Sequence, residues 1–207
     1  WHSWPQWEDF LDWAALWGIN LLPALTGQEE VQYKVFRALG LNDDEVRGWF
    51  NGPALLTWSR GQNGHGSGEL GPLPRSWMTA QWQLQKDQIL PRMRSLGIAG
   101  QLPAFQGNVP WALASKLPGT NMSQGGGMGN ETGWMDSRDP HFASIADLWM
   151  TTMLTDFGTI GHVYQMDGFF ASTGWGVDDS TAVAIEPACE YGPEQKDVYL
   201  AGDAADN

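Results

Sequence analysis

The chain has 207 residues, of which 42% are hydrophobic and 17% charged, a composition typical of a globular protein with a core. Its net charge of −13 argues against nucleic-acid binding, because a phosphate backbone needs a basic surface, and against anionic membranes. No apolar run approaches the roughly 20 residues that cross a bilayer.

Three further features bear on the compartment of the protein. The chain starts at Trp1, without an initiator Met or a signal peptide, which indicates processing or a fragment. Asn121 and Asn130 each begin an Asn-x-Ser/Thr acceptor for N-glycosylation, which favours a secretory route. Cys189 is the single cysteine, cannot form an intrachain disulfide, and is expected to be structural or incidental.

Apolar spacing predicts helices and strands in the first half of the chain. Residues 7–17 are expected to form a helix that Gly18 ends, with one apolar face. That face comprises Trp7, Phe10, Leu11, Ala14 and Trp17. The next expected elements are a buried strand at 19–22, a helix at 28–39, a helix from 43 to 50 capped by Asn42, and a strand-like run at 53–58.

The second half continues the alternation of helix and strand. A Gly-rich loop at 59–74 precedes a helix from 77 to about 96, which Ser76 is expected to cap and Pro91 to kink. The remaining expected elements are a strand at 98–105, a short helix at 110–117, a long loop at 118–138, a helix at 142–157 and a strand at 162–169.

Alternation of this kind predicts parallel βαβ units with helices packed outside the sheet. Four strands are half of an eightfold (β/α)8 TIM-type barrel, and a small open parallel α/β sheet is the structural alternative. We expect residues 1–175 to form a partial (β/α)8 catalytic-type domain. Residues 176–207 form an irregular, acidic segment that is a candidate for disorder.

Several kinds of site find little support in the sequence. The glycines at 125–129 neither follow a clear strand nor open a helix, as a phosphate-binding loop would. The four histidines lack metal-ligand spacing, and no Gly-x-Ser-x-Gly motif of a serine hydrolase occurs. We therefore expect no metal and no cofactor.

Polar side chains follow three of the expected strands, where parallel α/β proteins build their sites. Gln28 and Glu29 follow the first, Asn108 follows the strand that ends at Phe105, and Asp167 follows the last. Amides and carboxylates beside glycines and aromatics suit a sugar pocket. They also suit ordinary helix caps and turns, and the residues alone leave both interpretations open.

A series of segments resembles one known family from about Trp4 to Asp167. They are residues 13–21 (Trp-Ala-Ala-Leu-Trp-Gly-Ile-Asn-Leu), 27–29 (Gly-Gln-Glu), 52–58 (Gly-Pro-Ala-Leu-Leu-Thr-Trp), 71–74 (Gly-Pro-Leu-Pro) with 76–77 (Ser-Trp), 102–110 (Leu-Pro-Ala-Phe-Gln-Gly-Asn-Val-Pro), 139–142 (Asp-Pro-His-Phe) and 162–164 (His-Val-Tyr). In this order and approximate spacing they resemble the alpha-N-acetylglucosaminidase family, the lysosomal exo-hydrolases of heparan sulfate in glycoside hydrolase family 89.

The resemblance implies a hydrolase domain with a (β/α)8 barrel and a particular substrate. The family's reaction is retaining exo-cleavage of terminal α-linked N-acetylglucosamine, which uses two carboxyl groups. The resemblance places six residues in or near the sugar pocket: Asn20, Gln28, Glu29, Trp77, Asn108 and Asp167. It also implies a glycan with terminal N-acetylglucosamine as the partner, with the missing barrel half or a second copy completing the barrel, and glycosylation at Asn121 in a secreted, lysosomal or extracellular glycoprotein.

The chain departs from the family at the expected catalytic acid. The family carries Asp-Thr-Phe-Asn-Glu at the end of the fourth strand, and its Glu is the acid/base, whereas residues 167–171 here are Asp-Gly-Phe-Phe-Ala. Ala171 has no proton to donate, and the family nucleophile comes from a later strand. Three outcomes stay open: another carboxylate from Asp178, Asp179, Glu186 or Glu190 replaces the acid, the protein binds amino sugars without cleaving them, or the chain is an inactive remnant.

Overall fold

The computed structural model of the chain describes residues 3–52, 55–61, 73–124, 132–136, 138–158 and 162–165. Within them, β1 (Leu21–Pro23), β2 (Ala99–Pro103) and β6 (His162–Gln165) form a parallel sheet in the order β1-β2-β6. Leu21 of β1 pairs with Ala99, and Gly100 of β2 pairs with His162. The predicted α/β class with a parallel sheet is therefore present.

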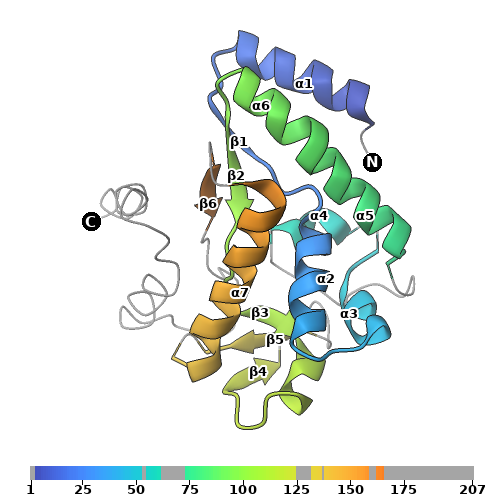
Figure 1. Cartoon of the computed structure of the whole chain (residues 1–207), viewed down its shortest axis with the longest axis vertical. Coiled ribbons are helices and arrows are strands. Elements are labelled where there is room, and N and C mark those ends of the chain that lie inside the picture. The colour runs from blue at the N-terminus through green and yellow to red at the C-terminus, as the bar shows by residue number, and fades with distance from the viewer. Residues whose placement is uncertain are drawn as a thin grey trace.

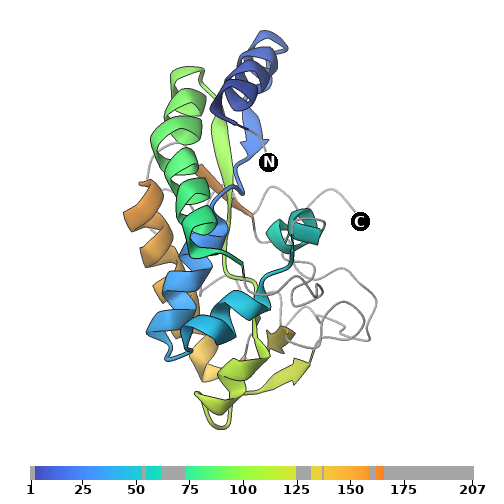
Figure 2. The same ribbon diagram turned by 90° about the vertical axis from the view of Figure 1, so that its right-hand side faces the viewer.

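Helices cross over between these strands on one face of the sheet (Figure 2). The first crossover is a continuous run of α5 (Arg75–Leu84), the π-helical η2 (Gln85–Ile89) and α6 (Leu90–Ser95). The second is α7 (Pro140–Phe157). Parallel strands require such crossovers because a short turn cannot reverse the chain twice.

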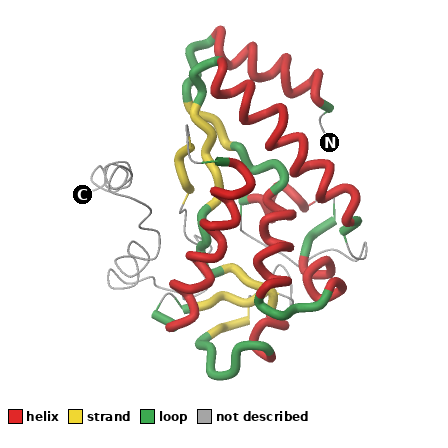
Figure 3. The backbone as a smooth tube through the Cα atoms, viewed as in Figure 1, coloured by secondary structure: helices red, strands yellow, loops and turns green. Residues whose placement is uncertain are grey.

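Each crossover is preceded by an insertion, and both insertions lie toward the carboxyl end of the sheet (Figure 1). The first comprises α2 (Gln28–Ala38), α3 (Asp43–Trp49) and α4 (Leu56–Arg60). The second comprises β3 (Asn108–Pro110), the 3-10 helix η3 (Trp111–Ser115), β4 (Met122–Gln124) and β5 (Thr132–Met135). The tube in Figure 3 shows its three strands as a separate small sheet, antiparallel and in the order β3-β5-β4.

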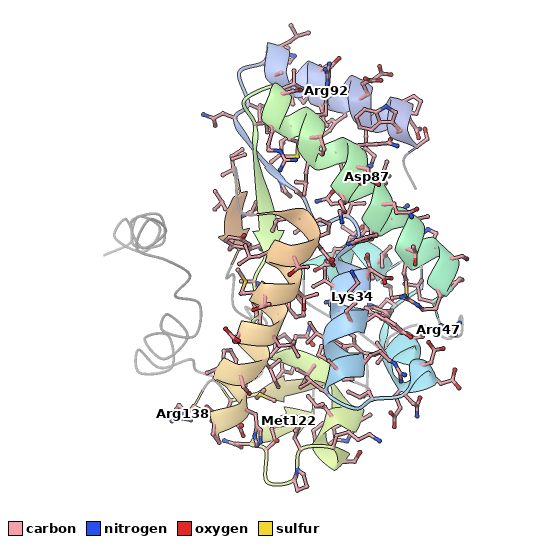
Figure 4. All side chains as sticks on the ribbon, in the orientation of Figure 1. Lys34, Arg47, Asp87, Arg92, Met122 and Arg138 are labelled. Atoms are coloured by element: carbon pink, nitrogen blue, oxygen red, sulfur yellow. The ribbon has the colours of Figure 1, made fainter. Side chains whose placement is uncertain are left out.

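An aromatic cluster packs the first insertion against α7 and the end of β2. The Phe36 ring lies 5.0 Å from Trp49 and 6.5 Å from Trp149, and Trp149 lies 5.8 Å from Phe105. The indole nitrogen of Trp149 also donates to the carbonyl of Pro103, the last residue of β2, at 2.9 Å. The insertion and the sheet therefore share one core. Lys34 of α2, labelled in Figure 4, adds an ion pair with Asp156 of α7 at 2.7 Å.

The helix α1 (Trp4–Leu16) buries less of its surface than expected. Leu11 and Ala14 are fully buried, but Phe10 and Trp13 are largely exposed and Trp17 is 73% exposed. The expectation that Trp17 belongs to the buried face is wrong, because the helix contacts the rest of the described chain along a narrow stripe. Arg92 of α6 joins it by a hydrogen bond to Asp12, 3.0 Å from the Nε atom (Figure 4).

Most predicted helices are confirmed to within a few residues, and so is the cap of α3. The Asn42 side chain accepts from the Glu45 amide at 2.9 Å, while Glu45 accepts from the Asn42 amide at 2.7 Å. The cap of α5 was predicted wrongly, since its N-cap position is Pro74 and not Ser76.

Two other expectations are corrected. The run at 53–58 does not form a strand in its described part, because residues 56–60 are the helix α4; the described sheet thus has three strands and not four. The expected loop at 118–138 contains β4 and β5, which pair with each other and with β3 through long-range contacts that carry no local periodicity. Residues 166–207, with Asp167, Ala171 and the expected irregular acidic segment, lie outside the described residues, as does Asn130.

Candidate amino-sugar site

Four residues separate the end of β1 from the first turn of α2, which lies at the carboxyl end of the sheet. Gly27 precedes it with a φ of +76°, and a Cβ atom there would lie 2.6 Å from the Cα of Trp82. Only glycine fits, because a side chain would clash with the backbone of α5. The β1–α2 connection is therefore pressed directly against the crossover helix, which fixes the position of Gln28 and Glu29.

Three of the predicted pocket residues converge on Arg60, the last residue of α4. The Glu29 carboxylate accepts from the Nε and Nη2 atoms of Arg60 at 2.7 and 3.3 Å. The Gln28 amide nitrogen donates to the backbone carbonyl of Arg60 at 2.9 Å. The guanidinium carbon of Arg60 lies 5.8 Å from the centre of the Trp77 ring, a cation–π contact.

Burial divides this cluster into inner and outer members. The Glu29 side chain is 1% exposed and Gln28 is 2% exposed, whereas the Arg60 side chain is 12% exposed and Trp77 is half-buried. The Oε1 atom of Gln28 has no hydrogen-bond partner among the described residues. Glu29 and Gln28 thus lie behind Arg60, and their hydrogen bonds hold it in place.

Asn108 lies in the second insertion, as the first residue of β3. It is fully buried and pairs across the small sheet with Trp134. Gly107 before it has a φ of +93°, and a Cβ atom there would lie 2.9 Å from the carbonyl oxygen of Met135. The strand therefore approaches β5 closely, and Asn108 is held by a different part of the fold from the Arg60 cluster.

Asn20 lies at the amino-terminal end of β1, the opposite end of this strand from Gln28 and Glu29. It directly precedes β1, and its carbonyl accepts from the amide of Ala99, the first residue of β2, at 2.7 Å. The structure therefore places Asn20 and the pair Gln28 and Glu29 at opposite ends of β1. Asp167 lies outside the described residues.

Arg60 is the site residue that sequence analysis missed. The sequence places it at the start of a Gly-rich segment, where an isolated arginine gives no local sign of a role. Its partner Glu29 is 31 residues away along the chain. The one available sequence signal was Glu29 itself, because an acidic side chain in the first turn of a buried helix needs a cationic partner elsewhere in the chain.

A second polar cluster surrounds Asn121 at the start of α7. Asp139 caps α7 by accepting from the His141 amide at 2.8 Å, and it also accepts from the amide of Asn121 at 2.5 Å. Burial raises the pKa of Asp139, but the hydrogen bonds from Asn121 and His141 outweigh it, so the pKa lies below its ordinary value. Asn121 itself is exposed, and its side-chain amide donates to Asp136 at 2.8 Å.

Within the described residues, no group of three His, Cys, Asp or Glu side chains is placed to hold a metal ion. The described helices include none with the length and apolar content that a membrane span requires. On β6, burial raises the pKa of Tyr164 to about 12, so its hydroxyl stays neutral at physiological pH.

Comparison with known proteins identifies the family. The model of the alpha-N-acetylglucosaminidase (NAGLU) TIM-barrel domain matches residues 1–186. The chain belongs to this family. Human alpha-N-acetylglucosaminidase is 39% identical over 175 residues, which cover 82% of this chain and 23% of the human protein.

Solved structures of a family member have the same fold. The family 89 glycoside hydrolase from Clostridium perfringens in complex with 2-acetamido-1,2-dideoxynojirmycin matches with a TM-score of 0.81 and 28% identity, over 91% of this chain and 22% of that chain. A variant of the clostridial enzyme with two Glu→Gln substitutions, in complex with its substrate GlcNAc-alpha-1,4-galactose, matches equally well. These alpha-N-acetylglucosaminidase relatives are glycoside hydrolases, and the chain spans about a quarter of their length.

Proposed function

We propose that the chain is part of a glycoside hydrolase that removes terminal α-linked N-acetylglucosamine from glycans with retention of configuration. The observation that carries the proposal is the 39% identity with human alpha-N-acetylglucosaminidase across most of the chain. The clostridial relative in complex with GlcNAc-alpha-1,4-galactose supports an amino sugar as the ligand. The Arg60 cluster supports a site at the carboxyl end of the sheet, where α/β folds bind ligands.

The pocket of this proposal contains Gln28, Glu29, Trp77, Asn108 and Asp167, with Arg60 added and Asn20 left out. Arginine donors and an aromatic ring suit the hydroxyl groups and the apolar face of a sugar. Asp167 remains in the proposal through the family resemblance.

The chain by itself is proposed to be inactive as a hydrolase. The family resemblance places Ala171 where the acid/base Glu is expected, and alanine cannot transfer a proton. Loss of a general acid typically removes about 10²–10⁴-fold of rate. We therefore propose that this chain contributes to sugar binding. Cleavage of the glycosidic bond would need carboxyl groups other than the one that Ala171 replaces.

A non-catalytic amino-sugar-binding protein is the second candidate, and Ala171 is the observation that favours it. A third is an inactive remnant. It is favoured by β1 and β6, each of which pairs with only one strand among the described residues. Unpaired sheet edges recruit other strands, so we propose that further barrel strands or a second copy of the chain covers them.

The proposed location is the secretory pathway, the lysosome or the extracellular space. The exposed position of Asn121 and the two glycosylation acceptors support this proposal. Digestion of the natural protein with an N-glycosidase should lower its apparent mass. An unchanged mass would contradict glycosylation.

Two measurements on the purified chain test the proposed function. The first is release of nitrophenol from an α-linked nitrophenyl N-acetylglucosaminide, and the second is calorimetric binding of 2-acetamido-1,2-dideoxynojirmycin. We expect binding without turnover. Turnover by this chain would show that another carboxylate acts in place of Ala171. Folded protein that neither binds nor cleaves would contradict both the hydrolase and the sugar-binding proposals.

A further inference from the structure

Glu29 and Arg60 form an almost fully buried ion pair at the carboxyl end of β1. Their side chains are 1% and 12% exposed, and two donors of the guanidinium reach the two carboxylate oxygens. We infer that Glu29 is a positioning residue for the amino-sugar site, which acts by fixing Arg60 and does not touch the sugar. This inference rests on the function proposed above.

The helix α4 is only five residues long, and isolated helices of that length are unstable in water, so contacts with the rest of the chain hold it. Ser59 accepts a buried hydrogen bond from Asn51 at 2.6 Å, which fixes the body of the helix. At its last residue, Gln28 holds the backbone carbonyl of Arg60 and Glu29 holds the Arg60 side chain. Of these contacts, only the one from Glu29 sets the direction of the guanidinium group.

The two hydrogen bonds between Glu29 and Arg60 fix the orientation of the guanidinium group. A carboxylate that receives two hydrogen bonds from one guanidinium fixes the plane of that group, which a single contact would not do. Arg60 then lies against Trp77, so the same pair also fixes the cation–π contact at the wall of the site. In an active site, a misplacement of about 1 Å can lower the reaction rate by as much as about 10²-fold, so the position of Arg60 matters to the site.

The neighbouring residue provides a matched control. Glu30 makes an equally close pair with Arg75, at 2.6 and 2.8 Å, and its side chain is also buried. Arg75 is the first residue of α5, and its guanidinium lies 3.6 Å from the centre of the Tyr33 ring. The Glu30 pair therefore joins the helices α2 and α5, and its hydrogen bonds within the described residues go to Arg75 and not to Arg60.

The experiment compares sugar binding with stability in four proteins: the unmodified chain, Glu29→Gln, Glu30→Gln, and the double variant Glu29→Met with Arg60→Met. Calorimetry gives the Kd for 2-acetamido-1,2-dideoxynojirmycin, and thermal unfolding gives Tm. We expect Glu29→Gln to bind about 10-fold more weakly. Glu30→Gln should bind within twofold of the unmodified chain, although both single variants should lower Tm.

The double variant separates positioning from folding. Replacing both members of a buried ion pair by apolar residues of similar size is often neutral for stability, because no charge is left unpaired. We expect its Tm to stay close to that of the unmodified chain while its Kd rises about 10-fold. Unchanged binding by the double variant would overturn the inference even if Glu29→Gln did not fold.

Two results would overturn the inference. If the folded double variant binds as tightly as the unmodified chain, the pair only stabilises the fold, and the proposed function stands. The same holds if Glu29→Gln and Glu30→Gln bind equally well. If the unmodified folded chain does not bind the ligand, the proposed function fails and the inference fails with it.

Discussion

At Gly27, both the backbone conformation and the neighbouring atoms exclude a side chain. Its φ is +76°, and α5 passes so closely that a Cβ atom would overlap the backbone of Trp82. Backbone cannot move aside as a flexible side chain can. The contact between the β1–α2 connection and α5 therefore depends on the absence of a side chain at this one position.

Gly27→Ala should destabilise the fold by about 2–5 kcal/mol, from the left-handed backbone and the overlap with Trp82 together. Gly40→Ala is the matched control, because Gly40 has a φ of +93° but open space around it, and it should cost only about 1–2 kcal/mol. Urea denaturation monitored by tryptophan fluorescence measures both values. Equal losses in the two variants would contradict the close approach at Gly27.

Asp139 should make stability depend on pH. Because folding lowers its pKa, the ionised carboxylate stabilises the fold above its ordinary pKa, and this contribution is lost as the pH falls through the lowered value. Asp139→Ala should therefore cost about 1–2 kcal/mol at pH 7 and progressively less below about pH 4.

Asn42→Ala is the control for this pH dependence, since the oxygen that caps α3 comes from an amide that does not titrate. Its cost, about 1 kcal/mol, should be similar at pH 7 and at low pH. Chemical denaturation at a series of pH values measures both variants. A loss for Asp139→Ala that stays constant down to pH 3 would contradict the assignment.

At the scale of the elements, a one-turn π-helix adjusts the first crossover to the sheet. The segment η2 lies between α5 and α6 without a break, and its buried residue Gln85 donates from its side-chain amide to the carbonyl of Ala24, just after β1, at 2.6 Å. A π turn accommodates one extra residue in an α-helix, so that the turns after it keep their faces. Ile89 of η2 and Met93 of α6 both face the core in this arrangement.

Deletion of Asp87, which is exposed on η2 (Figure 4), should remove this adjustment. The crossover would become a continuous α-helix one residue shorter, and the residues after the deletion would keep nearly the same faces toward the core. We expect the deletion to cost less than about 2 kcal/mol, and Asp87→Ala to change stability by less than about 0.5 kcal/mol. Thermal unfolding followed by circular dichroism tests this, and a loss of more than about 4 kcal/mol in the deletion variant would show that the turns after η2 had rotated away from the core.

At the scale of the whole molecule, the described sheet has two unpaired edges and an apolar surface next to one of them. Leu16 is exposed at the end of α1, Trp17 directly after it, and Leu21 at the start of β1. Large apolar side chains grouped on a surface usually mark an interaction. Their position beside β1 agrees with the proposal that more of a barrel, or a second copy, packs there.

The isolated chain should therefore self-associate with rising concentration. Replacing Trp13 and Trp17 with glutamine should shift the chain toward the monomer, because both side chains are largely exposed on this surface. Sedimentation velocity measures the shift. Thermal unfolding provides the control, since substitution of exposed side chains should leave Tm nearly unchanged. A monomeric unmodified chain at all concentrations would contradict the proposal.

The sequence by itself determined the features that depend on neighbouring residues. Helical spacing predicted the positions of α2, α3 and α7. Asn42 predicted the cap of α3, and glycines predicted the ends of helices. The motifs between Trp4 and Asp167 were enough to identify the family, because short segments in a fixed order can be recognised from the sequence alone. The parallel α/β class followed from the alternation of these elements.

Only the tertiary structure decided which distant groups meet. Folding brings Arg60 to Glu29, and it places Asn20 at the amino-terminal end of β1, away from Gln28 and Glu29. The small antiparallel sheet and the exposure of Trp17 could not be predicted from the sequence either. Periodicity shows which residues share a face of their own helix or strand. Ion pairs, strand pairing and burial depend on partners far away in the sequence.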